Sequence, residues 1–377
     1  MPQWDKATLL VIAAVATLFA APALAQDKAN STQVPKPTRP QEEAIAAAPL
    51  PYREEVVTFE NSAVPGVRLV GTLTLPSGSG PHAAAILLAG SGKNDRDETL
   101  SGHKPLLVLA DALTRQGYAV LRYDKRGAGQ SAGNYDAATM ADFTSDAKAA
   151  LAYLKNRPEI DGAKIGFIGH SEGGTIGALV AADDSSVAYV VMMAGFALPA
   201  KLLVAEQIRR FDVVEGKPPA EATQTYKLNM ALFDAIANAK DQAEAEMRVR
   251  QVLAAADPAP AKPEADQALM FARLPAMRFI LGYDPTASLR RLRVPVLALA
   301  GSKDIVVPPD VNLPALRKAL ANDPDVTIKE LPGLNHFFQH AETGSPREMS
   351  MIEETLAPEV TATVIHWIAG HTTARRP

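Results

Sequence analysis

The chain has 377 residues, 47% of them apolar and 21% charged, so it can bury a large core and is predicted to be globular. Its net charge of -4 argues against nucleic acid or an anionic membrane surface as the partner. The sequence contains no cysteine, which excludes disulfides, a thiol nucleophile and thiolate metal sites and fits an oxidising compartment.

The N-terminus is typical of a secretory signal peptide. Lys6 precedes an apolar run over residues 8–21, and the small residues Ala23 and Ala25 stand at the spacing of a cleavage site. We predict that residues 1–25 are the signal peptide, cut after Ala25, and that the mature protein is periplasmic or secreted. A membrane anchor is the weaker alternative, because the run is shorter than the ~20 residues of a spanning helix. The mature protein is therefore expected to keep no stable membrane anchor.

After the predicted signal peptide, the chain contains two segments of different composition. Residues 26–52 are rich in Pro, Ala, Gln and charge without periodicity, so they are predicted to be a disordered linker. Residues 56–59 and 67–75 then predict two strands of an opening hairpin.

Beyond the hairpin, strand and helix patterns alternate, which predicts a doubly wound, mostly parallel sheet with catalytic loops at the carboxyl ends of its strands. The predicted strands span residues 83–89, 118–123, 165–168, 187–194, 294–300 and 326–331. The predicted helices span residues 105–116, 140–156, 175–182, 313–321 and 358–368.

The alternation stops between residues 197 and 291. This segment is rich in Ala, Glu and Lys, residues 226–254 have strong helix propensity, and three prolines interrupt it at 258–263. We predict a helical cap at 197–291, inserted into a core formed by residues 53–196 and 292–377. A helical excursion packed on the side of the sheet is the alternative, but lids commonly seal active sites in this way.

A Gly-rich segment follows the predicted strand at 165–168, and it contains Gly169, Ser171 and Gly173. The pattern Gly-x-Ser-x-Gly is typical of a nucleophile elbow, a strained turn between strand and helix that exposes a serine hydroxyl. Chance alone produces the pattern in roughly one chain in ten of this length. Ser171 is the candidate nucleophile, with His170 pointing away from it, if the chain also supplies a base, an acid and an oxyanion hole.

A serine hydroxyl needs a base, oriented by an acid, and with this elbow both follow the serine in the chain, each just past a strand. His336 and Asp304 follow the last two predicted strands of the core, so we predict them as base and acid. His340 is the less favoured base, and His103 precedes the nucleophile, contrary to the expected order. Asp310 is the fallback acid, although it suits a helix cap better.

The oxyanion hole is expected to combine two backbone N–H groups. One belongs to Glu172, directly after the nucleophile, and the other to Ser91, in the Gly-Ser-Gly turn after the predicted strand at 83–89. An ordinary Gly-rich turn is one alternative. A phosphate-binding loop is another, but no Gly-Lys-Ser/Thr ends this turn, and the glycine spacing of dinucleotide sites is absent.

Together these motifs resemble the bacterial α/β-hydrolase esterases that are often grouped with the serine aminopeptidase-like hydrolases. The resemblance covers most of residues 54–370, is weak in the predicted cap, and implies the α/β-hydrolase fold. It also implies hydrolysis of a small-molecule carboxylic ester through an acyl-serine intermediate, without a metal or cofactor. Besides the elbow and the Asp304 segment, it rests on residues 90–97, 123–131, 283–285 and 331–354.

Two departures from the family pattern lie in the oxyanion loop. Ala89-Gly90 stands where many relatives carry a His-Gly dipeptide, and Lys93 stands where relatives often have proline. Both bear on pocket shape and loop rigidity. Charged residues nearby are interpreted as structural ion pairs and loop architecture rather than as acid–base groups. They are Asp95, Arg96, Asp97, Asp124 and Arg126, with Gly129 beside them.

Three functions stay open on the sequence alone. A carboxylesterase for small or medium acyl groups is preferred, and a peptidase or amidase would use the same three side chains. An aminopeptidase needs acids in the cap to hold the substrate amine, for which Glu206, Glu215 and Glu221 are available. The third function is a non-catalytic binding protein on a hydrolase scaffold. The sequence fixes neither the natural substrate nor the oligomeric state.

Overall fold

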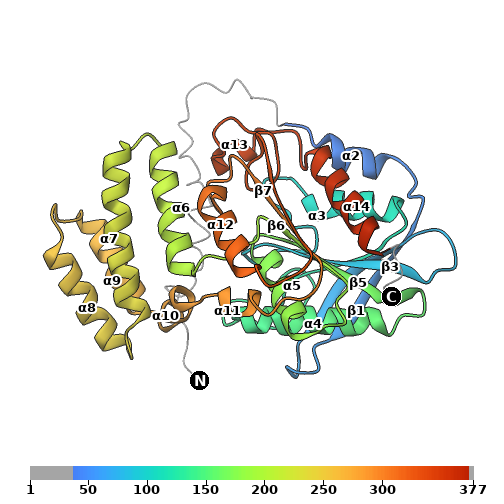
Figure 1. Ribbon diagram of the computed structural model, residues 1–377, viewed down its shortest axis with the longest axis horizontal. Coiled ribbons are helices and arrows are strands. Elements are labelled where there is room, and N and C mark those ends of the chain that lie inside the picture. Colours follow the sequence, from blue (N-terminus) through green and yellow to red (C-terminus); the bar gives the residue numbers. More distant parts are fainter. Residues whose placement is uncertain (1–36, 373–377) are drawn as a thin grey trace.

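A computed structural model describes residues 37–372 of the chain, so the predicted signal peptide lies outside the described residues. Its centre is one sheet of eight strands in the order β1-β2-β4-β3-β5-β6-β7-β8 (Figure 1). β1 and β2 run antiparallel at one edge, and from β4 to β8 every neighbouring pair is parallel. The predicted doubly wound, mostly parallel sheet is confirmed.

The strands form where the sequence has its short apolar runs. All six residues of β7 are buried, as expected for a parallel strand that is covered on both faces. The strands are β1 (Arg53–Glu60), β2 (Arg68–Leu75), β3 (His82–Leu88), β4 (Ala119–Tyr123), β5 (Ile160–His170), β6 (Val190–Met193), β7 (Val296–Gly301) and β8 (Val326–Leu331).

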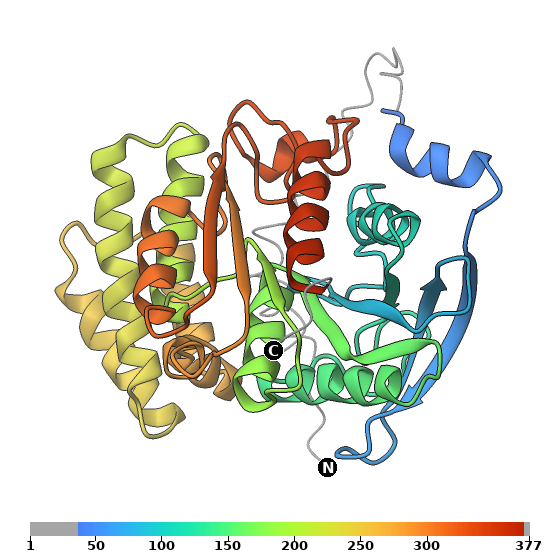
Figure 2. The same ribbon diagram turned by 45° about the vertical axis from the view of Figure 1, so that its right-hand side comes forward.

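Helices cover both faces of the sheet, and each face has its own apolar core. α3 and α14 pack on one face, whereas α4, α5 and α12 pack on the other (Figure 2). α4 begins at a capping box in which Thr139 and Asp142 exchange hydrogen bonds. The helices of the core are α3 (Pro105–Arg115), α4 (Met140–Lys155), α5 (Glu172–Asp183), α12 (Pro309–Ala319), α13 (Pro346–Met349) and α14 (Pro358–Thr372).

The predicted helical insertion between two sheet strands is confirmed, since every described element between β6 and β7 is a helix. These helices stand beside the sheet in Figure 1 and have an apolar core of their own, which includes Leu232, Phe233 and Ile236. They are α6 (Ala200–Val214), α7 (Pro219–Ala237), α8 (Gln242–Ala255), α9 (Lys262–Ala272), α10 (Pro275–Gly282) and α11 (Thr286–Leu289).

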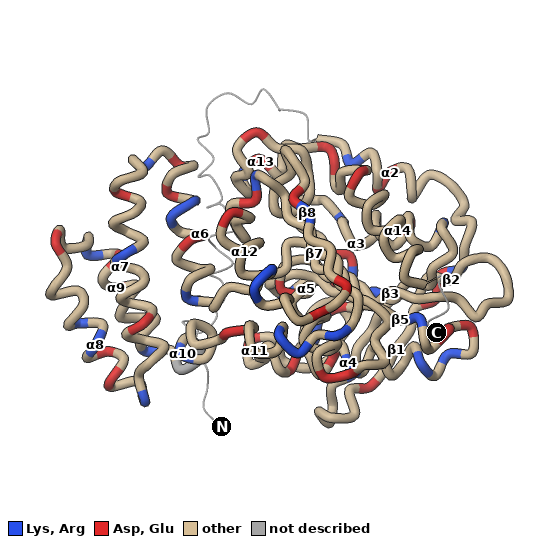
Figure 3. Tube along the Cα trace, viewed as in Figure 1, with Lys and Arg blue, Asp and Glu red and all other residues tan. Residues whose placement is uncertain are grey.

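The insertion contacts the core at loops that follow the sheet strands. Leu203 of α6 packs against Phe196, which follows β6, and against Val306 and Val307, which follow β7. Basic and acidic residues are interspersed along the chain in both the core and the insertion (Figure 3). Within residues 37–372, no helix has the combination of length and apolarity that crossing a bilayer requires.

The linker prediction over residues 26–52 is wrong for its described part, which contains the helix α2 (Pro40–Ala47). No residue of α2 is fully buried, although the partly buried Ile45 packs against one apolar core of the sheet. Polar side chains add to this packing: Arg39 donates to the carbonyl groups of Ser101 and Ile352, and Gln41 exchanges hydrogen bonds with the backbone of Leu356. Composition could not reveal these bonds, because their partners lie far away in the sequence.

Candidate active site

Ser171 occupies a sharp turn between β5 and α5. Its backbone has φ 51° and ψ -120°, a strained conformation for a residue with a side chain. A Cβ atom added to Gly169 would lie 2.1 Å from the carbonyl carbon of Gly173, and one added to Gly173 would lie 2.2 Å from the carbonyl oxygen of Leu88. Only glycine fits at both positions, which gives the Gly-x-Ser-x-Gly pattern its structural reason.

Asp304 and His336 are joined by a short buried hydrogen bond. The Nδ1 atom of His336 lies 2.8 Å from Oδ2 of Asp304, and both residues are almost fully buried. The other carboxylate oxygen, Oδ1, accepts the N–H groups of Val306 and Val307, each at 2.8 Å. Because a carboxylate only accepts, Nδ1 of His336 carries the proton and Nε2 is left as a base.

The loop that carries His336 lies directly against the elbow. Nε2 of His170 is 3.0 Å from the backbone carbonyl oxygen of His336, and the two imidazole rings are 4.7 Å apart. Within residues 37–372, the hydroxyl of Ser171 makes no hydrogen bond to His336. Such bonds are often long in unliganded enzymes and tighten with substrate. The structure thus brings the three predicted residues to one region, and their catalytic roles stay a prediction.

The two predicted oxyanion donors also lie in this region. A Cβ atom added to Gly90 would lie 3.3 Å from Cβ of Ser171, so the loop before Ser91 runs close to the nucleophile. In the described part of the chain, the N–H groups of Ser91 and Glu172 donate no hydrogen bond. Both groups are therefore free to bind a negatively charged oxygen, and the positive end of the α5 dipole adds to this tendency.

Sequence reasoning missed two buried charged residues that hold the oxyanion loop. Oε1 of Glu98 accepts the N–H of Gly90 at 2.6 Å and contacts Nδ1 of His170 at 2.9 Å. Nζ of Lys125 donates to the carbonyl oxygen of Gly90 at 2.5 Å and to the carboxylate of Glu172 at 2.7 Å. Lys125 lies inside a segment that carries the family resemblance and Glu98 directly follows another, but their partners become visible only in three dimensions.

The surroundings of His170 favour the charged form of its ring. Burial opposes a positive charge on its ring, but the carboxylate of Glu98, with smaller contributions from the carbonyl of His336 and from Asp304, outweighs it and raises the pKa of His170. The ring nitrogens face a carboxylate on one side and a carbonyl on the other, so both must donate. Both ring nitrogens of His170 are thus bonded to groups other than the Ser171 hydroxyl.

Tyr283 lies in the segment 283–285 that carries part of the family resemblance, but sequence reasoning assigned it no role. It belongs to the apolar cluster in which Leu203 meets Phe196, and its hydroxyl is buried without a hydrogen-bond partner among the described residues. Burial, followed by the negative charge of Glu172, raises its pKa well above the usual range. An unpaired hydroxyl between the core and the insertion, within the electrostatic influence of Glu172, is a candidate substrate contact.

The alternative residues considered from the sequence all have other partners. His103 is buried and bonded to Thr355 and to the carbonyl of Met349. The side chain of His340 is 58% exposed and pairs with Glu354. Asp310 pairs with Arg210 of the insertion. None of these three contacts the Asp304–His336 pair.

The charged loops beside the oxyanion turn are structural. Arg96 donates to Asp124 through its guanidinium at 2.8 Å, and Asp124 also accepts the backbone N–H of Gln130. Arg126 donates to the buried carboxylate of Asp146 at 2.7 Å. These bonds agree with the interpretation of the loops as ion-paired architecture.

Comparison with known proteins places this arrangement in a family. The family model Hydrolase_4, described as serine aminopeptidase, S33, matches residues 106–342. The chain belongs to this family of serine hydrolases. Esterase EstD of Thermotoga maritima is 32% identical over 160 residues, which are 42% of this chain and 38% of EstD. An uncharacterized 31.7 kDa protein of Escherichia coli, encoded in the traX-finO intergenic region, is 26% identical over 243 residues, or 63% of this chain and 78% of that protein.

Solved structures show the same fold at low sequence identity. The esterase Pf2001 of Pyrococcus furiosus superposes with a TM-score of 0.53 and 16% identity, covering 86% of this chain and 92% of its own. A proline iminopeptidase of Mycobacterium smegmatis has a TM-score of 0.51 and 19% identity, covering 85% and 99%. Est1E of Butyrivibrio proteoclasticus, solved with ferulic acid, has a TM-score of 0.51 and 17% identity, covering 84% and 100%. The fold is therefore that of the α/β-hydrolases.

Proposed function

We propose that this family member hydrolyses carboxylic esters of small or medium acyl groups through an acyl-serine intermediate. The observation that carries the proposal is the buried bond between Asp304 and His336, whose loop packs on the elbow that presents Ser171. The names of relatives add support, because EstD and Pf2001 are both described as esterases.

In the proposed mechanism, Nε2 of His336 takes the hydroxyl proton of Ser171 while the serine oxygen attacks the ester carbonyl. The N–H groups of Ser91 and Glu172 bind the oxyanion of the tetrahedral intermediate. When the intermediate collapses, the imidazolium of His336 protonates the departing alcohol and leaves the acyl group on the serine. A water molecule, deprotonated by the same imidazole, then releases the carboxylic acid. Asp304 keeps Nδ1 protonated throughout and stabilises the imidazolium.

The state of the acidic residues favours esters over aminoacyl substrates. An aminopeptidase must hold the protonated amine of its substrate with an acid that is not already neutralised. Glu206 is paired with Arg209 at 2.6 Å, and Glu215 with Arg347 at 2.6 Å. Glu172, beside the nucleophile, is paired with Lys125. Of the three acids considered for this role, Glu221 alone has no ion pair within the described residues, and it is exposed on α7.

The proposal is tested by comparing 4-nitrophenyl esters of graded acyl length with aminoacyl 4-nitroanilides, on the chain from Gln26 onward. We expect turnover of short and medium esters, much slower anilide cleavage, and loss of at least about 10³-fold in kcat in Ser171→Ala. Anilide cleavage that outpaces ester cleavage would move the assignment to the peptidase alternative. Ester turnover at the wild-type rate in Ser171→Ala would refute the proposed mechanism.

We also propose that the protein is exported and that its signal peptide is removed after Ala25. This proposal rests on the N-terminal sequence pattern alone. N-terminal sequencing of protein recovered from the periplasm or the medium should begin at Gln26. Retention of residues 1–25 in the cytoplasmic fraction would contradict it.

A further inference from the structure

Lys125 is a buried cation that touches Glu172 and Gly90, the residue whose carbonyl shares a peptide unit with the N–H of Ser91. It lies just beyond β4, its side chain is 7% exposed, and its ammonium group donates to the Gly90 carbonyl at 2.5 Å and to Oε2 of Glu172 at 2.7 Å. The ammonium also lies 4.8 Å from the centre of the Phe143 ring, close enough for a cation–π contact.

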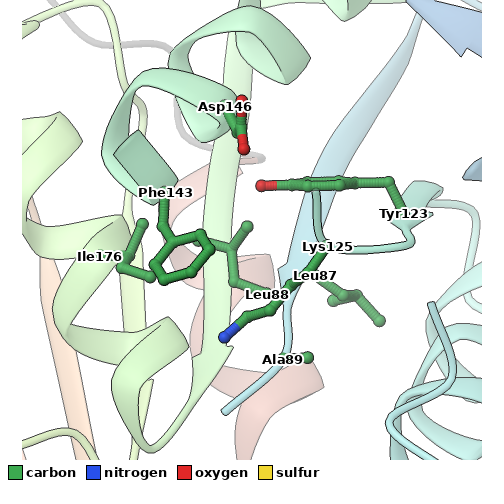
Figure 4. A pocket seen from close by; sticks show the side chains of 8 residues that line it. All are labelled: Leu87, Leu88, Ala89, Tyr123, Lys125, Phe143, Asp146 and Ile176. Carbon is green, nitrogen blue, oxygen red and sulfur yellow. The ribbon is translucent and has the colours of Figure 1, made fainter. Parts of the chain in front are cut away.

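The wider surroundings of Lys125 do not account for its charge. The side chain lines a cavity of about 10 Å³, no larger than one water molecule needs. Figure 4 shows the amine on the Phe143 side of this cavity, pointing away from Asp146. Asp146 is already paired with Arg126. The polar partners of the ammonium are therefore Gly90 and Glu172, and both belong to the oxyanion site.

The geometry of the peptide bond links Lys125 to the Ser91 donor. The carbonyl of Gly90 and the N–H of Ser91 belong to one peptide unit, which is planar and trans, so they point in opposite directions. Anchoring the carbonyl on Lys125 therefore fixes the direction of the Ser91 N–H. The amide of Asn94 donates to the same oxygen at 2.9 Å, and the N–H of Gly90 is held by Glu98. A cation on the carbonyl also polarises the peptide and strengthens its N–H as a donor.

A contribution to the stability of the fold does not explain the buried ammonium group of Lys125. Burying a charge is costly, and buried ion pairs can often be replaced by apolar residues without loss of stability. Orientation of the two donor segments is a reason that fits all the contacts. We propose that Lys125 is a positioning residue of the oxyanion hole: it orients the Ser91 N–H through the Gly90 carbonyl and holds the first turn of α5 through Glu172. This inference rests on the proposed hydrolytic function.

The central test replaces Lys125 with methionine, which keeps length and volume but removes the charge and both hydrogen bonds. We expect kcat for a 4-nitrophenyl ester to fall about 10- to 100-fold, less than the 10²- to 10³-fold cost of losing a donor entirely. KM should change less than about threefold, because the donors act mainly on the transition state. A trifluoromethyl ketone, which forms an oxyanion adduct with the serine, should lose affinity by about the same factor as kcat.

Lys164→Met is the matched control, because this lysine of β5 is 42% exposed and pairs only with Asp161 in the described structure. Its kcat and ketone affinity should equal those of the wild type. Lys125→Arg keeps the cation and should recover part of the loss; it also replaces the methionine variant as the test if the latter does not fold. Thermal melting establishes folding for each variant.

Removing Lys125 also leaves the negative charge of Glu172 uncompensated next to the oxyanion. A double variant separates this charge effect from the loss of positioning. Lys125→Met combined with Glu172→Gln should stay slow, since the Gly90 carbonyl has still lost its cationic donor and keeps only the amide of Asn94. Recovery of the wild-type rate in the double variant would overturn the positioning role, as would wild-type kcat and ketone affinity in folded Lys125→Met. In either case an inactive Ser171→Ala would leave the hydrolytic function intact, so the two failures are distinguishable.

Discussion

Replacing Asp304 with asparagine tests the base and its orienting acid together. The amide oxygen can still accept the N–H groups of Val306 and Val307, which Oδ1 now accepts at 2.8 Å, so the loop should keep its shape. The new NH₂ group, however, donates where Oδ2 accepted from Nδ1 of His336. The imidazole must then accept at Nδ1 and carry its proton on Nε2, where it cannot deprotonate Ser171.

The expected cost is large because this change removes the base rather than weakening it. With the wrong tautomer in a Ser-His-Asp arrangement, kcat falls about 10⁴-fold, which at 1.36 kcal/mol per tenfold is about 5.4 kcal/mol of transition-state stabilisation. The assay is the initial rate on a short 4-nitrophenyl ester under saturation. We expect KM and the melting temperature of Asp304→Asn to stay close to the wild-type values.

Asp310→Asn is the control for this experiment, because Asp310 also follows β7 but its carboxylate pairs with Arg210 of α6. Its kcat should equal that of the wild type. If Asp304→Asn kept more than a tenth of the wild-type kcat, or if Asp310→Asn proved the more damaging change, the assignment of the acid would be refuted.

Three further predictions follow from the contacts around the site. Gly90→Ala would place a methyl group 2.7 Å from Oε1 of Glu98 and 3.3 Å from Cβ of Ser171, so steady-state kinetics should show a lower kcat with a smaller change in KM. Tyr283→Phe removes a hydroxyl without a partner in the described structure, so we expect an unchanged melting temperature. KM should change by about 2- to 10-fold, to an extent that depends on the acyl group. A KM equal to that of the wild type for every acyl group would exclude a substrate contact. Because the pKa of His170 is raised in the folded protein, its protonated ring stabilises the fold fully below about pH 6.5, the pKa of an unfolded histidine. This stabilisation is lost as the pH rises through the pKa of the folded protein. The melting temperature should therefore decline more steeply with rising pH in the wild type than in His170→Gln.

The sheet and the candidate triad were predictable because their signals are local. β3 and β7 are short, largely apolar runs, and the glycines around Ser171 are required by contacts with the adjacent strand and helix. Asp304 and His336 were found by position alone, since residues just past successive parallel strands meet at one edge of the sheet. α12 begins at Pro309, four residues before its predicted start at 313, because proline is favoured at the first position of a helix.

What the sequence could not reveal depends on contacts between distant segments. In the sequence alone, Lys125 and Glu98 are indistinguishable from other charged loop residues, and only the structure shows their hydrogen bonds to Gly90. α2 was predicted as part of a linker because its order comes from Arg39 and Gln41 reaching loops more than 60 residues away in the chain. Local propensity carries no information about such partners, so these features need the folded structure.

Covalent labelling is the most direct test of the central claim, that Ser171 is a nucleophile activated by His336 and Asp304. The mature protein is treated with a fluorophosphonate, and the modified residue is located by mass spectrometry of its peptides. The account predicts one adduct, on Ser171, formed quickly in the wild type and far more slowly in His336→Ala. Labelling of another residue, or labelling of Ser171 at an equal rate in both proteins, would contradict it.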